Sequence, residues 1–191
     1  MGEPAKRRAT YEDLFAVPEN AIGEILDGAL VVTARPSPEH ARATSALGIE
    51  IGPAYDFGRG GGPGGWIIFY EPEVWFAGRG EPLVPDLAGW KRARFRRSKE
   101  HNWIDVIPDW ICEVLSPGSV KRDRVLKMDI YRESAEVRHV WLVDPLNKTL
   151  EVFGRDESAA WARLGFFADN DRVRAAPFEE VEFALTGLWL D

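Results

Sequence analysis

The stretch that decides the fold is Pro108-Asp-Trp-Ile-Cys-Glu113-Val-Leu-Ser116-Pro-Gly118. Between Trp110 and Leu115 it is apolar except for one carboxylate, that of Glu113. A short apolar run bounded by turn residues is typical of a buried strand. A buried carboxylate costs free energy unless cations or hydrogen-bond donors compensate it. The sequence therefore predicts a central strand whose one charged side chain needs partners.

A helix is expected after this strand, from about Val120 to Ser134, with Ser119 as its N-cap. Lys127 falls near the middle of the apolar stripe of this helix, so it faces the same core as Glu113. A lysine in this position either snorkels along the stripe, forms a plain bridge to Glu113, or belongs to a functional site. The stripe consists of Val120, Leu126, Ile130 and Tyr131, with Asp123 and Arg124 at its edges.

The segment Leu83-Val-Pro-Asp86-Leu-Ala-Gly-Trp90 repeats the pattern of a carboxylate, Asp86, inside an apolar strand. Two carboxylates on adjacent strand ends can share Mg²⁺, which typically binds one or two carboxylates, waters and substrate phosphate. Such a cation polarises a phosphoryl oxygen and lowers the pKa of a bound water. A neighbouring lysine can orient the water or offset charge on the phosphate. Asp86, Glu113 and Lys127 would together suffice for metal-assisted phosphodiester hydrolysis.

Length and composition set limits on the class of protein. The 191 residues are enough for one domain with a real core. No apolar run approaches the roughly 20 residues of a membrane span, and no signal peptide is visible, so we expect a cytoplasmic protein that does not enter a membrane. The single cysteine, Cys112, excludes an intramolecular disulfide, fits a reducing compartment and is expected to pack as a small hydrophobe.

Basic residues are concentrated in two runs, although the net charge of −7 argues against a bulk affinity for nucleic acid. The first run is Lys91-Arg-Ala-Arg-Phe-Arg-Arg-Ser-Lys99, and the second is Lys121-Arg-Asp-Arg124. They are either a solvated loop and a solvated helix face, or contacts to DNA phosphates, in which case the first run is expected near the active-site edge. The candidate DNA-binding residues are Lys91, Arg92, Arg94, Arg96, Arg97, Lys121 and Arg124.

Asp27-Gly28 between two apolar runs predicts a β-hairpin over Glu24 to Val32. A helix is expected from about His40 to Tyr55, with His40 facing inward as a hydrogen-bonded core residue or as part of a site. Thr10 to Asp13 has the pattern of a capping box, which predicts a short helix. A loop is expected at 58–65, where the glycines lack the context of a phosphate-binding loop, and a turn at 78–82. Further strands are expected at 66–70, 74–76, 137–143, 149–153, 161–167 and 181–185.

Several segments, taken in order, resemble the putative restriction endonuclease family that is expanded in cyanobacteria, within the PD-(D/E)XK phosphodiesterase superfamily. The resemblance covers nearly the whole chain. Its segments are Glu24-Ile-Leu-Asp-Gly28, Pro36-Ser-Pro-Glu-His40, Val84-Pro-Asp86-Leu, the Pro108 to Pro117 stretch, Asp123-Arg-Val-Leu-Lys127 through Tyr131, and Val140-Trp-Leu-Val-Asp144-Pro.

The resemblance implies an α/β (α+β) fold with a restriction-endonuclease-like core, a mixed β-sheet flanked by helices. The expected domain spans residues 10–191 and follows a flexible tail, residues 1–9. The resemblance also implies a metal, Mg²⁺ or Mn²⁺, held by Asp86 and Glu113 with the backbone carbonyl of Val114 nearby. The superfamily lysine normally follows the acid by two residues. That position here is Leu115, and Lys127 on the following helix takes its place.

The leading expectation for function is therefore a magnesium-dependent DNA endonuclease, a hydrolase with Asp86, Glu113 and Lys127 as its catalytic residues. Glu24 and His40 are expected accessory residues, the first as an outer carboxylate and the second as a phosphate contact or core hydrogen bond. DNA is the expected partner, and a homodimer is a further expected assembly. One alternative is a non-cleaving module that binds nucleic acid or a partner on the same fold. Another is a purely structural ion-pair network in the core.

Overall fold

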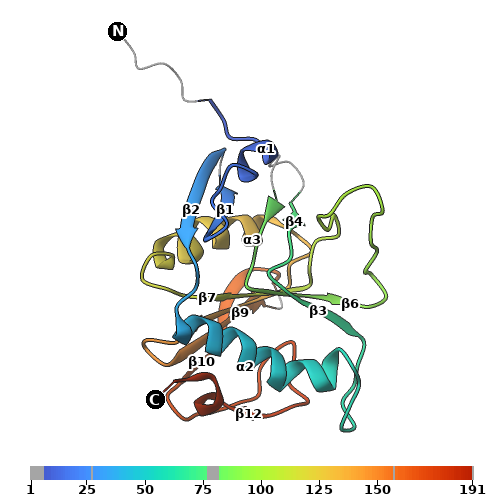
Figure 1. Ribbon diagram of the computed structural model, residues 1–191. Coiled ribbons are helices and arrows are strands. Elements are labelled where there is room, and N and C mark those ends of the chain that lie inside the picture. Colours follow the sequence, from blue (N-terminus) through green and yellow to red (C-terminus); the bar gives the residue numbers. More distant parts are fainter. Residues whose placement is uncertain (1–6, 27, 77–81, 157, 191) are drawn as a thin grey trace.

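A six-stranded mixed sheet occupies the centre of the computed structural model, which describes residues 7–26, 28–76, 82–156 and 158–190 (Figure 1). Its strand order is β10-β9-β8-β7-β6-β3. Strands β7 and β8 pair in parallel, and every other pair in this sheet is antiparallel. The mixed sheet expected from the sequence is confirmed. Its strands are β3 (Trp66–Tyr70), β6 (Leu87–Lys91), β7 (Trp110–Val114), β8 (His139–Asp144), β9 (Thr149–Arg155) and β10 (Trp161–Ala168).

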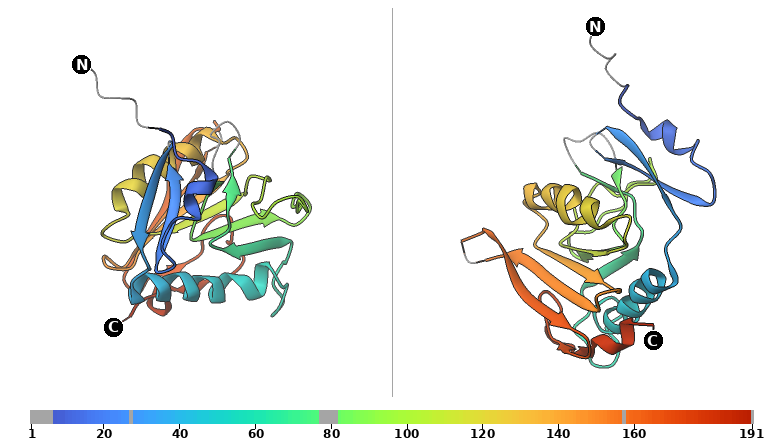
Figure 2. Two further views of the ribbon diagram at one scale, coloured as in Figure 1. Left: turned by 45° about the horizontal axis from the view of Figure 1, so that its top comes forward. Right: turned by 90° about the vertical axis from the view of Figure 1, so that its left-hand side faces the viewer.

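The two faces of the sheet carry separate hydrophobic cores. Helix α2 (Pro38–Tyr55) packs on one face, in a core that includes Trp110 and Cys112 from β7. Helix α3 (Met128–Glu133) packs on the other face, in a core that includes Ile111. Because successive side chains of a strand point to opposite faces, Glu113 projects on the same side as Ile111, toward α3. Figure 2 shows the two helices on either side of the strands.

The predicted hairpin is confirmed as β1 (Ala21–Leu26) paired with β2 (Ala29–Ala34), and it lies beyond one end of the sheet (Figure 2). Gly28 in its turn has a φ of 76°, a conformation that glycine adopts without strain. The Ala9 N–H donates to the Gly28 carbonyl, which links the start of the described chain to the hairpin. Beside the hairpin lie α1 (Tyr11–Leu14), β4 (Val74–Trp75) and β5 (Pro82–Leu83).

The expected strand over 83–90 is divided in the structure, because β5 ends at Leu83 and β6 begins at Leu87, so Asp86 directly precedes a strand. The expected turn at 78–82 falls almost entirely outside the described residues. The C-terminal strand forms, but outside the main sheet, in a pair of β11 (Arg172–Val173) and β12 (Phe183–Ala184). A 3₁₀ turn over Leu185–Leu188 follows it.

The helix after the central strand departs from its predicted apolar stripe. It contains a π-helical turn over Arg122–Lys127 before α3 begins. A π turn is wider than an α turn, so it changes which residues point inward. Leu126, expected in the stripe, is therefore 50% exposed, whereas Lys127, Ile130 and Tyr131 are buried as predicted. Ser119 precedes the helix, but its side chain bonds Ser116 and caps no helical N–H.

His139 at the start of β8 gives a test of how pH acts on this fold. Burial lowers the pKa of His139 from 6.5 to about 4. The positive charges of Lys91 and Arg138 act in the same direction, and the negative charge of Asp109 opposes them. Between these pH values the unfolded chain binds a proton at His139 that the folded chain does not, so folding stability falls as the pH drops. We expect the melting temperature of His139→Gln to fall less steeply from pH 6.5 to 4 than that of the wild type. Parallel curves would contradict this assignment.

Candidate active site

Asp86 and Glu113 come from neighbouring parts of the sheet, since Asp86 directly precedes β6 and Glu113 lies on β7. Strands β6 and β7 pair Leu87 with Cys112, so continuing this antiparallel register by one residue sets Asp86 opposite Glu113. Directly opposite residues of an antiparallel pair point to the same face of the sheet. Continued in this way, the register sets both acids on one face, as a shared cation site requires.

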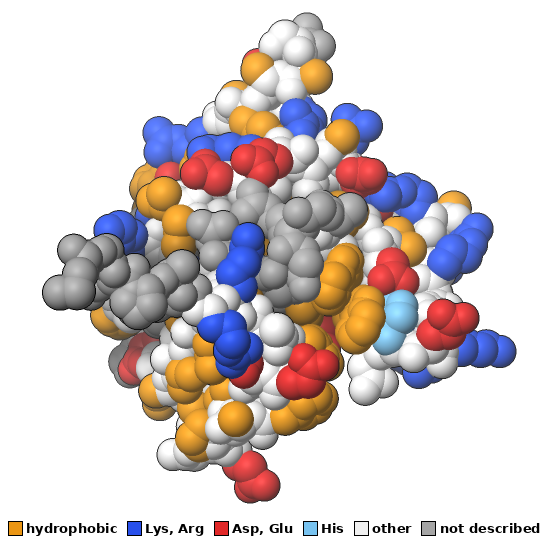
Figure 3. Space-filling view, turned by 90° about the horizontal axis from the view of Figure 1, so that it is seen from above, with side chains coloured by type: hydrophobic (Ala, Val, Ile, Leu, Met, Phe, Trp, Pro, Cys, Tyr) orange, Lys and Arg blue, Asp and Glu red, His pale blue; other side chains and the backbone are white. Residues whose placement is uncertain are grey.

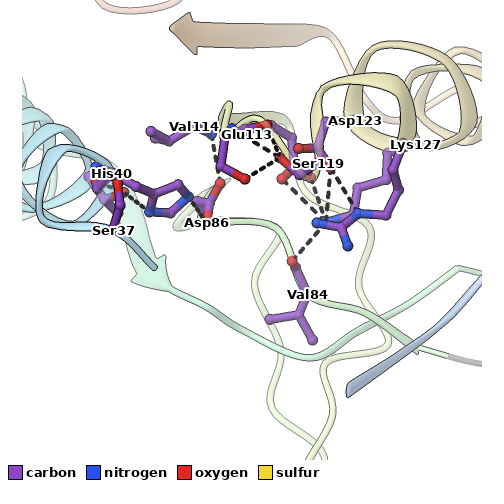
Figure 4. A network of polar contacts seen from close by, with 12 residues as sticks. Ser37, His40, Val84, Asp86, Glu113, Val114, Ser119, Asp123 and Lys127 are labelled. Carbon is purple, nitrogen blue, oxygen red and sulfur yellow. Dashed lines mark hydrogen bonds and ion pairs between the residues drawn. The ribbon is translucent and has the colours of Figure 1, made fainter. Parts of the chain in front are cut away.

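The Lys127 ammonium lies among three carboxylates contributed by three different elements (Figure 4). Its Nζ is 2.9 Å from Glu24 Oε1 of the hairpin, 3.3 Å from both Glu113 oxygens and 3.9 Å from Asp123 Oδ1 of the π turn. It also donates to the Val84 carbonyl at 3.1 Å. The Lys127 side chain is only 3% exposed, so Lys127 does not snorkel to the surface. Because it contacts three acids, it is also not part of a plain two-residue bridge.

Burial and the charges of neighbouring groups act in opposite directions on the pKa values of this cluster. Burial raises the pKa of Glu113 well above its ordinary value, and Lys127 acts in the opposite direction. Burial alone would lower the pKa of Lys127, but the negative charges of Glu113, Glu24 and Asp123 outweigh it and raise that pKa. Lys127 is therefore a permanent cation at neutral pH. Burial likewise raises the pKa of Asp123.

Asp86 is held in place by two donors on opposite sides. The Val114 N–H donates to its Oδ2 at 2.6 Å, and His40 Nε2 lies 3.2 Å from its Oδ1. Burial lowers the pKa of His40, but Asp86 outweighs that effect and the net shift is upward. His40 is thus the inward-facing histidine of α2 that the sequence predicts, and its partner is the candidate carboxylate itself. Figure 4 shows Asp86 between His40 and Glu113, with Lys127 at the far side of the cluster.

A cleft of about 700 Å³ opens onto these groups. It brings together every predicted metal-binding, catalytic and accessory residue. Sequence reasoning did not assign five charged residues of its wall to the site: Arg35, Glu71, Glu73, Arg122 and Asp123. Asp123 was recognisable from its spacing of four residues before Lys127, which places two side chains on one side of a helix. The candidate residues that line the cleft are Glu24, His40, Asp86, Glu113, Val114 and Lys127.

The first basic run does not lie at this cleft, so the prediction that it borders the active-site edge is wrong. Strand β6 begins directly after Asp86 and ends at Lys91. Five extended residues span roughly 17 Å, so Lys91 lies about that far from Asp86. Arg92 and Arg94 pair with Asp56 and Asp109 at 2.8 and 2.5 Å, at that far end. In the view of Figure 3 acidic and basic side chains alternate, with no continuous basic face.

The second basic run is on the helix that carries Lys127. Lys121 is exposed, and Arg124 pairs with Glu151 at 2.5 Å. Between them, Arg122 reaches the cleft, where its Nε is 3.2 Å from Asp123 Oδ1 and its Nη1 is 3.9 Å from Glu24 Oε2. Of this run, the structure therefore sets Arg122 rather than Lys121 or Arg124 at the cleft.

Comparison with known proteins shows the family of the chain. A model of the Uma2 family, described as putative restriction endonuclease, matches residues 9–186. The chain belongs to this family. The match extends over more than nine-tenths of the chain, so it includes both the hairpin and the sheet.

A solved structure supports the fold of this family member. The crystal structure of a putative nuclease belonging to DUF820 from Anabaena variabilis superposes with a TM-score of 0.70 and 20% sequence identity. The alignment covers 94% of this chain and 97% of that one. No curated protein is similar enough to count as a relative. Among the described residues, no helix is long and apolar enough to cross a membrane.

The donor set of the cluster fits a hard divalent cation. Each carboxylate oxygen accepts about two hydrogen bonds. Among the described residues, each of the four oxygens has one donor: His40 for Asp86 Oδ1, the Val114 N–H for Asp86 Oδ2, Tyr131 for Glu113 Oε1 and Lys127 for Glu113 Oε2. One position thus remains on each of these oxygens. The described residues hold no ready-made group of three metal-binding side chains, so waters or a phosphate would complete the coordination.

Lys127→Met tests whether one ammonium compensates the buried acids. The substitution keeps the aliphatic stem but leaves Glu24, Glu113 and Asp123 without their shared cation. Breaking a buried ion pair on one side costs roughly 3–5 kcal/mol, which for a chain of this size lowers the melting temperature by about 10 °C. Lys121→Met, at an exposed position of the same helix, is the matched control and should melt like the wild type. Equal melting temperatures for both variants in metal-free buffer would refute the compensation.

Proposed function

We propose that this protein is a metal-dependent phosphodiesterase of the PD-(D/E)XK type that hydrolyses phosphodiester bonds in DNA. The observation that carries the proposal is the Lys127 ammonium, buried beside Glu113 at a cleft that Asp86 also lines. A chain that needed only a stable core would gain little from burying these charges, because an apolar replacement of similar volume is often as stable. Membership of a family of putative restriction endonucleases supports the same function.

Asp86 and Glu113 would hold Mg²⁺ or Mn²⁺, with the Val114 carbonyl as a third oxygen. In an antiparallel ladder the N–H and C=O of one residue face the same neighbouring strand. The Val114 N–H faces Asp86, so the Val114 carbonyl faces the same side. When bound, such a cation polarises the phosphate and makes a bound water more acidic. His40 and the Val114 N–H fix the orientation of Asp86, which keeps both of its oxygens available in the cleft.

Lys127 would contribute positive charge at the phosphate, where negative charge grows during hydrolysis. Its three carboxylate contacts and its bond to the Val84 carbonyl hold the ammonium in one position, so the charge needs no rearrangement during the reaction. Glu24 has a positioning role in this scheme, because it also accepts the Val84 N–H at 3.2 Å. The hairpin thereby helps to place the lysine.

Cleavage of plasmid DNA tests the function directly. We expect the wild-type protein to nick a supercoiled plasmid with Mg²⁺ or Mn²⁺ but not with EDTA. Asp86→Asn and Glu113→Gln should lose nicking because they weaken the cation site. Lys127→Met should retain Mn²⁺ binding yet nick at least 100-fold more slowly, a factor typical of removing one charge-stabilising group, and Lys121→Met should nick normally. A wild-type protein that binds DNA but never nicks it would support the non-cleaving alternative instead.

DNA binding is proposed to depend on the cations beside the cleft, Arg35 and Arg122, with Lys121 and Arg124 on the same helix. We expect Arg35→Gln to weaken binding of any DNA sequence and to reduce its salt dependence, because a variant that neutralises fewer phosphates releases fewer counterions on binding. Arg96→Gln and Arg97→Gln, in the exposed distant run, are the controls and should change neither quantity. The reverse result would return the DNA-binding role to that run. The homodimer and the cytoplasmic location expected from the sequence stay predictions.

A further inference from the structure

We propose that Tyr131 is a positioning residue for the cation site, because its hydroxyl holds one oxygen of Glu113 and leaves the other for a divalent cation. The inference rests on the proposed function, since it requires that Glu113 bind a metal. It assigns a role to a residue that does not itself reach the cleft. Tyr131 therefore acts on the site only through Glu113.

The contact between the two side chains is direct and fully buried. The Tyr131 hydroxyl donates to Glu113 Oε1. The Tyr131 ring is completely buried in the core beneath α3, where it packs against Phe76 with 5.6 Å between ring centroids. Glu113 and Lys127 line the cleft, whereas Tyr131 does not belong to the described part of its wall. The oxygen that Tyr131 holds is thus drawn toward the core and away from the cleft.

Lys127 and Tyr131 hold different oxygens of Glu113. The Lys127 Nζ is 3.3 Å from both oxygens, but it donates its hydrogen bond to Oε2. The Tyr131 hydroxyl, in contrast, bonds Oε1. Oε1 is thus held toward the core by Tyr131, whereas Oε2 is held by Lys127, a residue of the cleft wall, and keeps one position for a cation among the described contacts. The tyrosine therefore decides which oxygen of Glu113 serves as the ligand.

A group that orients a metal-binding side chain changes the metal affinity by a measurable factor. Loss of a hydrogen bond behind a metal-binding side chain typically weakens metal affinity or activity 10- to 100-fold. Tyr131→Phe removes only the hydroxyl and keeps the ring in its core. We expect the Mn²⁺ dissociation constant of Tyr131→Phe, measured by calorimetric titration, to rise at least 10-fold. Nicking should need correspondingly more Mn²⁺ and should recover, at least in part, at saturating Mn²⁺.

The chain contains a matched control in Tyr55. Its hydroxyl also donates to a glutamate, Glu180 Oε2, at 2.8 Å, and its ring is also buried, but in the core on the α2 face. Tyr55→Phe removes the same atom away from the cleft, although Glu180 is exposed and the Tyr55 hydroxyl also accepts the Glu180 and Val181 N–H groups. It should leave the Mn²⁺ affinity unchanged even where it lowers the melting temperature. An affinity loss of the same size in Tyr55→Phe would overturn the proposal.

A second control separates the hydroxyl from damage to its own core. Phe76→Leu disturbs the ring that packs on Tyr131 but keeps the hydroxyl donor. If the Mn²⁺ affinity falls as much in Phe76→Leu as in Tyr131→Phe, loose packing explains the loss and the positioning role is wrong. Titration at 10 °C keeps this comparison valid for variants that melt early. A Tyr131→Phe protein with wild-type Mn²⁺ affinity also refutes the role.

These outcomes are distinguishable from failure of the proposed function itself. A wild-type protein that shows no Mn²⁺ binding in the titration would refute the metal site, and with it both proposals. A wild-type protein that binds Mn²⁺ and nicks DNA, together with a Tyr131→Phe variant of equal affinity, would refute the tyrosine alone. The affinity is read without DNA, so it does not depend on activity.

Discussion

The structure depends on the sharing of one buried cation by carboxylates from separate parts of the chain. Glu24 comes from the hairpin, Glu113 from the centre of the sheet and Asp123 from the π turn, and all three meet at Lys127. Each of these acids has further partners, but the ammonium is the cation that all three share, so its loss would destabilise them together. The ion cluster therefore joins the hairpin, the sheet and the helix in addition to the hydrophobic cores.

The sheet explains how a charged cluster and two apolar cores coexist. Strand β7 directs Trp110 and Cys112 to the α2 face and Ile111 to the α3 face, and it is buried along its whole length. Glu113 follows in the same alternation, so its side chain enters the space beneath the helix only where the strand is about to end. Because the paired part of β6 begins at Leu87, the Val114 N–H bonds the side chain of Asp86 rather than the backbone of that strand.

Much of the site was predictable because its members violate the local pattern. Glu113 and Lys127 stand out as charges at positions where apolar residues are expected, and Asp86 repeats the anomaly. Such a violation is visible in one sequence because a strand and a helix have known periods. The hairpin was predictable for a different reason, since Asp27-Gly28 matches a specific turn chemistry.

Other features were beyond a single sequence because they depend on non-local geometry. The position of Lys91 follows from the direction in which β6 runs, and no local pattern specifies that direction. Tyr131 was predicted to be buried, but its hydroxyl partner is a residue 18 positions away on another element. Leu126 was misplaced because the helical period of 3.6 does not apply across a π turn.

The π turn also restricts how this chain can vary in length. Residues 122–127 occupy a wider turn than an α-helix would make, and the position of Lys127 relative to Asp123 is set by that width. Removing one residue there would let the segment close into an ordinary helix, and α3 would keep the face that it presents to the core. The spacing between Asp123 and Lys127 would shrink, however, so the ammonium would lose its present place beside Asp123. A one-residue deletion is therefore compatible with the helix but not with the ion cluster, whereas substitutions are tolerable along the exposed side of this segment.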